Sequence, residues 1–142
     1  MRRVGKLLAG IWLLSGAPAA QAPIEGLQPV ATMKELMVDV IHPASNSLLL
    51  AVNRGGPGDD KGWAEARRSA MTLAESGNLL IMRNRAAAWV ADARLLTEVG
   101  TAAYRAAAAK DAKGLAALAD RLDASCTTCH AQFRPNVFPA AR

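Results

Sequence analysis

Cysteine is almost absent from this 142-residue sequence, and its two cysteines, Cys126 and Cys129, lie three residues apart near the C-terminal end. A disulfide between them would close a very small loop and would stabilise little. A redox-active dithiol of the thioredoxin kind belongs between a strand and a helix, and no segment alternates in the strand pattern. Zinc held by both thiols would need two more ligands, but apart from His130, which directly follows Cys129, the only other histidine is His42 and there are no further cysteines. These absences leave few roles for the pair.

The chain also lacks a large excess of positive or negative charge when its first 22 residues are left out. The chain has 17 Lys and Arg against 12 Asp and Glu, but three of the basic residues fall within residues 1–22. Residues 23–142 therefore carry 14 basic against 12 acidic side chains. No basic stretch is interleaved with aromatic residues, so we expect no nucleic-acid partner. No apolar run after residue 22 reaches the length of a membrane span, so we expect no stable membrane span in this part.

Residues 1–22 have the pattern of a secretory signal peptide. A basic start at residues 2–6 precedes an apolar core at residues 7–14 and mostly small residues at 17–22. The apolar core is too short to span a membrane, and an uncleaved N-terminal anchor is the alternative. The sequence thus predicts export to the periplasm, with residues 23–142 as a single mature domain.

Helical periodicity runs through this domain, where apolar residues recur at three- and four-residue steps. The apolar stripes are separated by a glycine-rich loop at residues 53–62, by residues 83–85 and by a turn at residues 110–111. The first helix is expected to begin near Pro29, and Pro43 should kink or break it. Helices joined by short connections predict an all-α fold, an antiparallel four-helix bundle. The stripes run from Val30 to Leu48, Trp63 to Leu80, Trp89 to Ala107 and Leu115 to Phe133.

The inner faces of the second and third helices carry small residues, namely Ala66, Ala70, Gly77, Gly100 and Ala103. Small residues let two helices approach closely, and they also leave room for a flat cofactor. Both uses stay open at the level of the sequence.

The two cysteines belong to the run Cys126-Thr127-Thr128-Cys129-His130, which is the attachment signature of c-type haem. Thiols at positions i and i+3 lie on one face of a helix, where each can add to a vinyl group of the porphyrin. His130 then offers an imidazole nitrogen to the iron. The sequence therefore predicts one covalent haem c, attached through Cys126 and Cys129, with His130 as a metal ligand.

An exported four-helix pattern that ends in Cys-x-x-Cys-His-x-x-aromatic-Arg resembles the class II c-type cytochromes, cytochrome c-prime and its low-spin relatives. The matching run here is residues 126–134, in which Phe133 and Arg134 occupy the last two positions. The resemblance covers residues 28–134 in architecture, but only the first and fourth helices in recognisable motif. It implies that Arg134 lies near the proximal side of the haem, where a cation tunes the reduction potential. The alternative for Arg134 is a solvated cation at a helix C-terminus.

In that family the first helix covers the other side of the haem, with a methionine or an apolar side chain over the iron. The resemblance implies that Met37 occupies this distal position as a metal ligand, and that Met33 stands where the family often has an arginine near a propionate. The two lie one turn apart on one face, so either sulfur could reach the iron. Ordinary core packing is the alternative for both. His42 is a further candidate, but five residues after Met37 it would project about 140° away on a regular helix.

These features favour a carrier of single electrons over an enzyme, because the sequence shows no general base, substrate pocket or second metal. The alternative is a binder of a diatomic gas, NO or CO, at an iron left open on its distal side, as in cytochrome c-prime proper. Redox proteins are the expected partners, and the resemblance allows a homodimer. Trp63 and Trp89 are expected to pack in the core or at the edge of the haem. Asp92, Arg83 and Arg85 are expected on the solvated surface.

Overall fold

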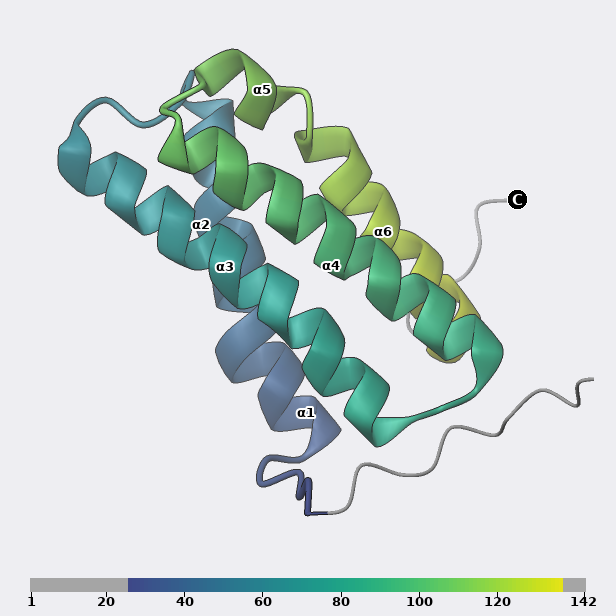
Figure 1. The fold of residues 1–142 in the computed structure, drawn as a ribbon. Coiled ribbons are helices and arrows are strands. Elements are labelled where there is room, and N and C mark those ends of the chain that lie inside the picture. The colour runs from purple at the N-terminus through teal and green to yellow at the C-terminus, as the bar shows by residue number, and fades with distance from the viewer. Residues whose placement is uncertain (1–25, 137–142) are drawn as a thin grey trace, which may run out of the picture.

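The structure, a computed structural model, describes residues 26–136, and every regular element within this range is helical. The long helical segments of this range pack together as a helical bundle (Figure 1). The first is continuous and consists of α1 (Met33–Glu35), the π-helical segment η1 (Leu36–Ile41) and α2 (His42–Asn53). The others are α3 (Asp60–Arg83), α4 (Ala87–Ala108) and, after the short α5 (Ala112–Ala116), α6 (Ala119–Phe133). The prediction of an all-α fold is confirmed.

The predicted signal peptide, residues 1–22, lies outside the described residues, as do the first and last few residues of the predicted domain. Between residues 26 and 136, no helix is long and apolar enough to cross a membrane.

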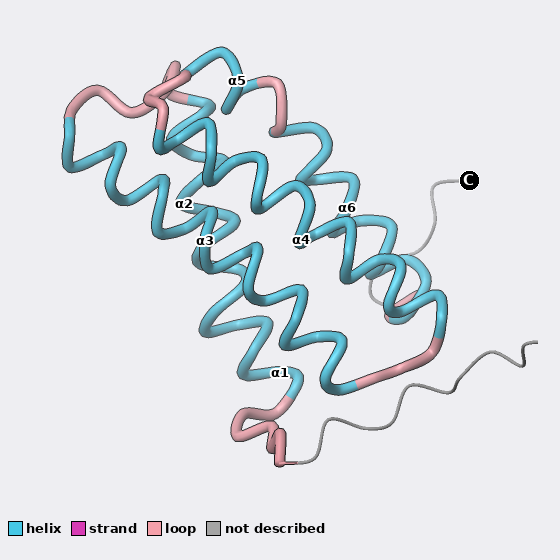
Figure 2. The backbone as a smooth tube through the Cα atoms, viewed as in Figure 1, coloured by secondary structure: helices cyan, strands magenta, loops and turns pink. Residues whose placement is uncertain are grey.

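The connections between the long helices are short, as Figure 2 shows. α3 and α4 lie side by side, α2 packs against α3, and α6 packs against α4 (Figure 1). The predicted break at residues 83–85 is confirmed, because α3 ends at Arg83 and α4 begins at Ala87. The stripes predicted for these two helices form much of the core, in which Leu73, Leu80 and Val99 are at most 3% exposed.

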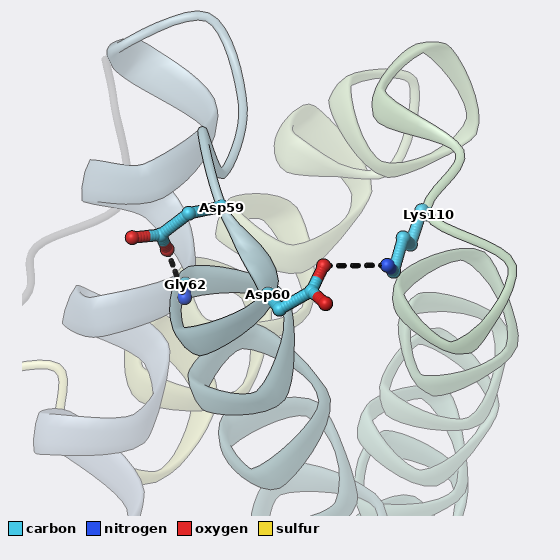
Figure 3. Close-up of polar contacts among 4 residues, drawn as sticks. All are labelled: Asp59, Asp60, Gly62 and Lys110. Atoms are coloured by element: carbon cyan, nitrogen blue, oxygen red, sulfur yellow. Dashed lines mark hydrogen bonds and ion pairs between the residues drawn. The ribbon is translucent and has the colours of Figure 1, made fainter.

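Aspartate side chains fix two helix starts (Figure 3 shows the first). An Asp59 Oδ accepts a hydrogen bond from the Gly62 amide at 2.7 Å, and Asp111 accepts one from Gly114 at 2.9 Å. An ion pair of 2.6 Å between Asp60 and the Lys110 ammonium joins the start of α3 to the turn after α4 (Figure 3). Both of its side chains are largely exposed, so the pair adds little to stability.

The first helix begins later than Pro29, where the sequence predicted it. Its N-cap is Thr32, whose hydroxyl accepts the Glu35 amide while the Glu35 carboxylate accepts the Thr32 amide. This reciprocal pair is a capping box, which satisfies two backbone donors at once. Val30 lies outside the helix and is fully exposed, so its assignment to the apolar stripe was wrong.

Pro43 neither breaks nor ends the first helix, because the turn before it widens into the π-helical segment η1. The His42 amide reaches back five residues to the carbonyl of Met37. In a regular α-helix the proline ring would clash with the carbonyl of Asp39, four residues earlier. The wider turn accommodates the ring and lets the chain continue as α2.

The fourth predicted helix is divided in two. After α5, the Leu118 amide bonds to the carbonyl of Leu115, three residues back, and the chain turns before α6 begins. The tighter turn still leaves Leu115 and Leu122 on the core side, each 2% exposed. The predicted apolar face therefore survives the break, and it leads directly to the two cysteines.

Two glycines allow α3 and α4 to approach very closely. A Cβ atom on Gly100 would lie 2.5 Å from the Ala74 amide nitrogen and 2.8 Å from its Cα. A Cβ atom on Gly77 would lie 2.6 Å from the carbonyl oxygen of Ala93. Because these neighbours are backbone atoms, neither can move aside without separating the helices. Of the two uses that the sequence left open for these glycines, the structure supports close packing.

Substitution Gly100→Ala should therefore destabilise the protein, because its methyl group can be accommodated only if α3 and α4 move apart. We expect the free energy of unfolding in urea to fall by about 1–3 kcal/mol. Gly58→Ala is the matched control, since a Cβ atom there would meet nothing within 4 Å, and it should change stability by less than about 0.5 kcal/mol. Equal effects of the two substitutions would contradict the close packing.

Candidate cofactor site

A cavity of about 540 Å³ lies between the first helix and α6, with α3 and α4 contributing to its wall. This volume falls within the range of cofactor and small-molecule sites. Apolar side chains of the first helix, α3 and α4 line it, including Ile41, Leu49, Leu80 and Leu96. The predicted site residues that line the same cavity are Met37, Cys126, Cys129, His130 and Arg134.

The structure separates the two methionines that the sequence treats as alternatives. Met37, in η1, lines the cavity. Met33, one turn earlier in α1, is half-buried against the hydrophobic core and is not among the residues that line the cavity.

Both cysteines lie on α6, half-buried and not joined in a disulfide. Burial raises the pKa of the Cys126 thiol. It also raises the pKa of Cys129 to about 11, with further contributions from the negative charge of Asp92 and from Cys126. Reactive dithiols have lowered thiol pKa values, so this environment is unlike theirs.

His130 follows Cys129 on α6 and is half-buried in the cavity wall. Burial lowers the pKa of its imidazole, and the nearby Arg134 cation lowers it further. A lowered pKa extends the pH range in which the imidazole is neutral, and only the neutral form can bind a metal. Arg134 follows the last turn of α6, where its amide donates to the His130 carbonyl at 2.7 Å, and its side chain is exposed at the cavity mouth.

Trp89 holds the end of α6 against the rest of the bundle. Its indole nitrogen donates to the carbonyl of Leu80 at 2.8 Å, and its ring meets Phe133 edge to face with centroids 4.9 Å apart. Phe133 is the last residue of α6, so this contact fixes the helix end that carries His130. Trp89 is buried in the core and Trp63 is half-buried against it, which supports core packing, one of the two positions expected for them.

His42 lines the cavity together with Met37, contrary to the angle that the sequence predicts. The prediction assumed a regular α-helix, in which residues five apart point in different directions. The hydrogen bond from the His42 amide to the Met37 carbonyl instead stacks residues five apart on one face. Pro43 was the signal for this change, because π-turns are one way in which a helix accommodates a proline.

Asp92 was missed, because its assignment to the solvated surface was wrong. It lies on α4, is only 9% exposed and lines the cavity. The spacing could have revealed it, since Asp92 stands three residues after Trp89 and four before Leu96, within the apolar stripe.

Arg83 and Arg85, which were both expected on the solvated surface, differ in their exposure. Arg83 is half-buried and donates to the carbonyls of Leu79 at 2.8 Å and Ala31 at 3.1 Å, so it ties the end of α3 to the segment before the first helix. Its assignment to the solvated surface was therefore wrong. Arg85 is exposed, as expected.

Within the described range, no three His, Cys, Asp or Glu side chains gather as a candidate metal-ion site. Comparisons with protein-family models, with curated proteins and with solved structures find no significant match to this chain.

The raised pKa of Cys129 predicts slow alkylation of this thiol in the folded chain. Since the thiolate is the nucleophile, a Cys126→Ser variant at pH 8 should react with iodoacetamide on the order of 100-fold more slowly folded than unfolded in urea. The rate for the folded chain should keep rising with pH up to about 11, because the thiol stays protonated below that value. Mass spectrometry measures the alkylation rate at each pH. A rate that levels off near pH 7 would contradict a raised pKa for Cys129.

Proposed function

We propose that this chain is an exported c-type cytochrome that carries single electrons, with one haem c held in the cavity. The observation that supports this best is the convergence of both thiols and the imidazole of the Cys-x-x-Cys-His run on one cavity, with Met37 also in its wall. Covalent haem c requires two thiols for the links to the porphyrin and an imidazole as one iron ligand, and His/Met ligation adds a thioether on the other side, next to an apolar surface. The residues therefore fit the cofactor.

Each residue has a distinct part in this proposal. Cys126 and Cys129 would hold the cofactor covalently, and the neutral imidazole of His130 would be the proximal ligand. Met37 would be the distal ligand, and it is preferred to Met33 because only Met37 lines the cavity. The bound haem would supply the one-electron couple. The apolar wall would exclude water and lower the local dielectric constant, which also affects the reduction potential.

The wider proposal follows from the same residues. The chain would be an antiparallel four-helix bundle with covalent haem, similar to the class II c-type cytochromes, and residues 1–22 would direct it to the periplasm. Redox proteins would be its partners, meeting it where the cavity opens to solvent. The exposed guanidinium of Arg134 at that mouth would contribute positive charge to the contact.

Absorption spectra of the exported protein test the proposal, recorded oxidised and reduced, with and without carbon monoxide. We expect a haem spectrum that is low-spin in both states and that does not change with the gas, because Met37 fills the distal position. Absence of haem would refute the proposal. A high-spin spectrum that shifts with carbon monoxide would instead support the gas binder.

Variants of the first helix identify the distal ligand in the same measurement. Met37→Ala should remove the charge-transfer band of a sulfur–iron bond, whereas Met33→Ala should retain it. If His42 replaces the lost sulfur, Met37→Ala will stay low-spin, and only the double variant Met37→Ala/His42→Ala will become high-spin and bind carbon monoxide. Retention of the sulfur band in Met37→Ala would show that Met37 is not the ligand.

A further inference from the structure

Asp92 is the one charged side chain that is buried among residues 26–136. The other two buried polar side chains there, Ser76 and Ser125, donate their hydroxyls to helix carbonyls at 2.6 and 2.8 Å. The Oδ2 atom of Asp92 is also buried, and it has no hydrogen-bond partner among the described residues. Buried polar atoms are nearly always paired, so this oxygen calls for an explanation.

The position of Asp92 indicates what could offset the cost of burying its charge. The side chain lines the cavity from α4, and its negative charge acts on the Cys129 thiol across from it on α6. A buried carboxylate without a donor is costly, and a positive charge entering the cavity would reduce that cost. The iron and porphyrin ring of ferric haem, leaving the peripheral propionates aside, carry such a charge, because Fe³⁺ exceeds the charge of the ring dianion by one. Ferrous haem does not.

We propose that Asp92 lowers the reduction potential of the haem by stabilising its ferric state. This inference rests on the proposed function, since it requires haem in the cavity. The carboxylate acts through space from the wall and is not a ligand. Its effect is strong because burial limits screening by water.

The other charged groups at the cavity lie in a different environment. Asp123, Arg134 and the titratable His42 also line it, but all three are exposed to solvent. Water and salt screen exposed charges, so each should act on the haem more weakly than Asp92 does. Asp123 therefore provides a matched control: it is the same residue type, on the same cavity, differing in burial.

The test is a spectroelectrochemical titration of the exported, haem-loaded protein. Asp92→Asn should raise the midpoint potential, so that the ferrous-to-ferric ratio at a fixed applied potential increases about tenfold, equivalent to about 59 mV for a one-electron couple. Asp123→Asn should change that ratio less than about twofold. Asp92→Glu retains the charge and should stay close to the unsubstituted protein.

The outcomes distinguish failure of the role proposed for Asp92 from failure of the proposed function. An unsubstituted protein without covalent haem would refute the proposed function itself. Haem-loaded Asp92→Asn with an unchanged or lower potential would overturn the inference alone. Should Asp92→Asn fail to retain haem, Asp92→Leu removes the charge with an apolar side chain, and a raised potential there supports the proposal. Loss of haem from both, with retention in Asp92→Glu, would show that the carboxylate is needed for assembly and would overturn a role limited to the potential.

Discussion

The close approach of α3 and α4 at Gly77 and Gly100 is the contact on which the rest of the bundle depends. Glycine removes the Cβ atoms that would otherwise hold the two backbones apart. With this pair fixed, α2 packs against α3 and α6 packs against α4. At the α5 end, Leu48 and Leu122 are both buried and close the core. Farther along the first helix and α6, the cavity lies between them, so it is a consequence of how the helices are arranged around one tight pair.

The first helix shows how a single backbone constraint determines what faces this cavity. Pro43 cannot donate an amide hydrogen bond, and its ring excludes the carbonyl four residues back. The resulting π-turn places Met37 and His42 in the same wall. π-turns occur often at functional sites, because they change the direction of side chains without ending the helix. Asp92 adds a second departure from a regular apolar interior, a charge inside the core stripe of α4.

Much of the fold could be predicted from the sequence, since helical periodicity and capping residues act locally. The stripes of α3 and α4, the break at residues 83–85 and the caps at Asp59 and Asp111 all follow from such signals. The position of the first N-cap could not be predicted in this way. The apolar periodicity continues back to Val30, and a proline at position 29 suits the first turn of a helix. The division between α5 and α6 has no comparable sequence signal.

The candidate site was predictable in part for the same reason. The run from Cys126 to His130 is local, so its spacing alone could predict that the two thiols and the imidazole belong to one site. The π-turn could not be assigned, because it depends on how the helix accommodates Pro43. The burial of Asp92 depends on which face of α4 the other helices cover, although its spacing within the stripe was a usable signal. Both differences from the prediction lie where the molecule is irregular: at His42 the backbone departs from α-helical geometry, and at Asp92 a polar residue occupies a core position.

The proposed function requires that Cys126 and Cys129 hold a haem covalently. Intact-mass spectrometry of the exported protein after extraction with acidified acetone, which removes haem that is not covalently bound, tests it most directly. We expect a mass that exceeds that of the polypeptide by one haem, and a Cys126→Ala/Cys129→Ala variant whose mass is that of the polypeptide alone. A mass equal to the bare polypeptide in the unsubstituted protein, exported by cells that attach haem to other c-type cytochromes, would contradict it.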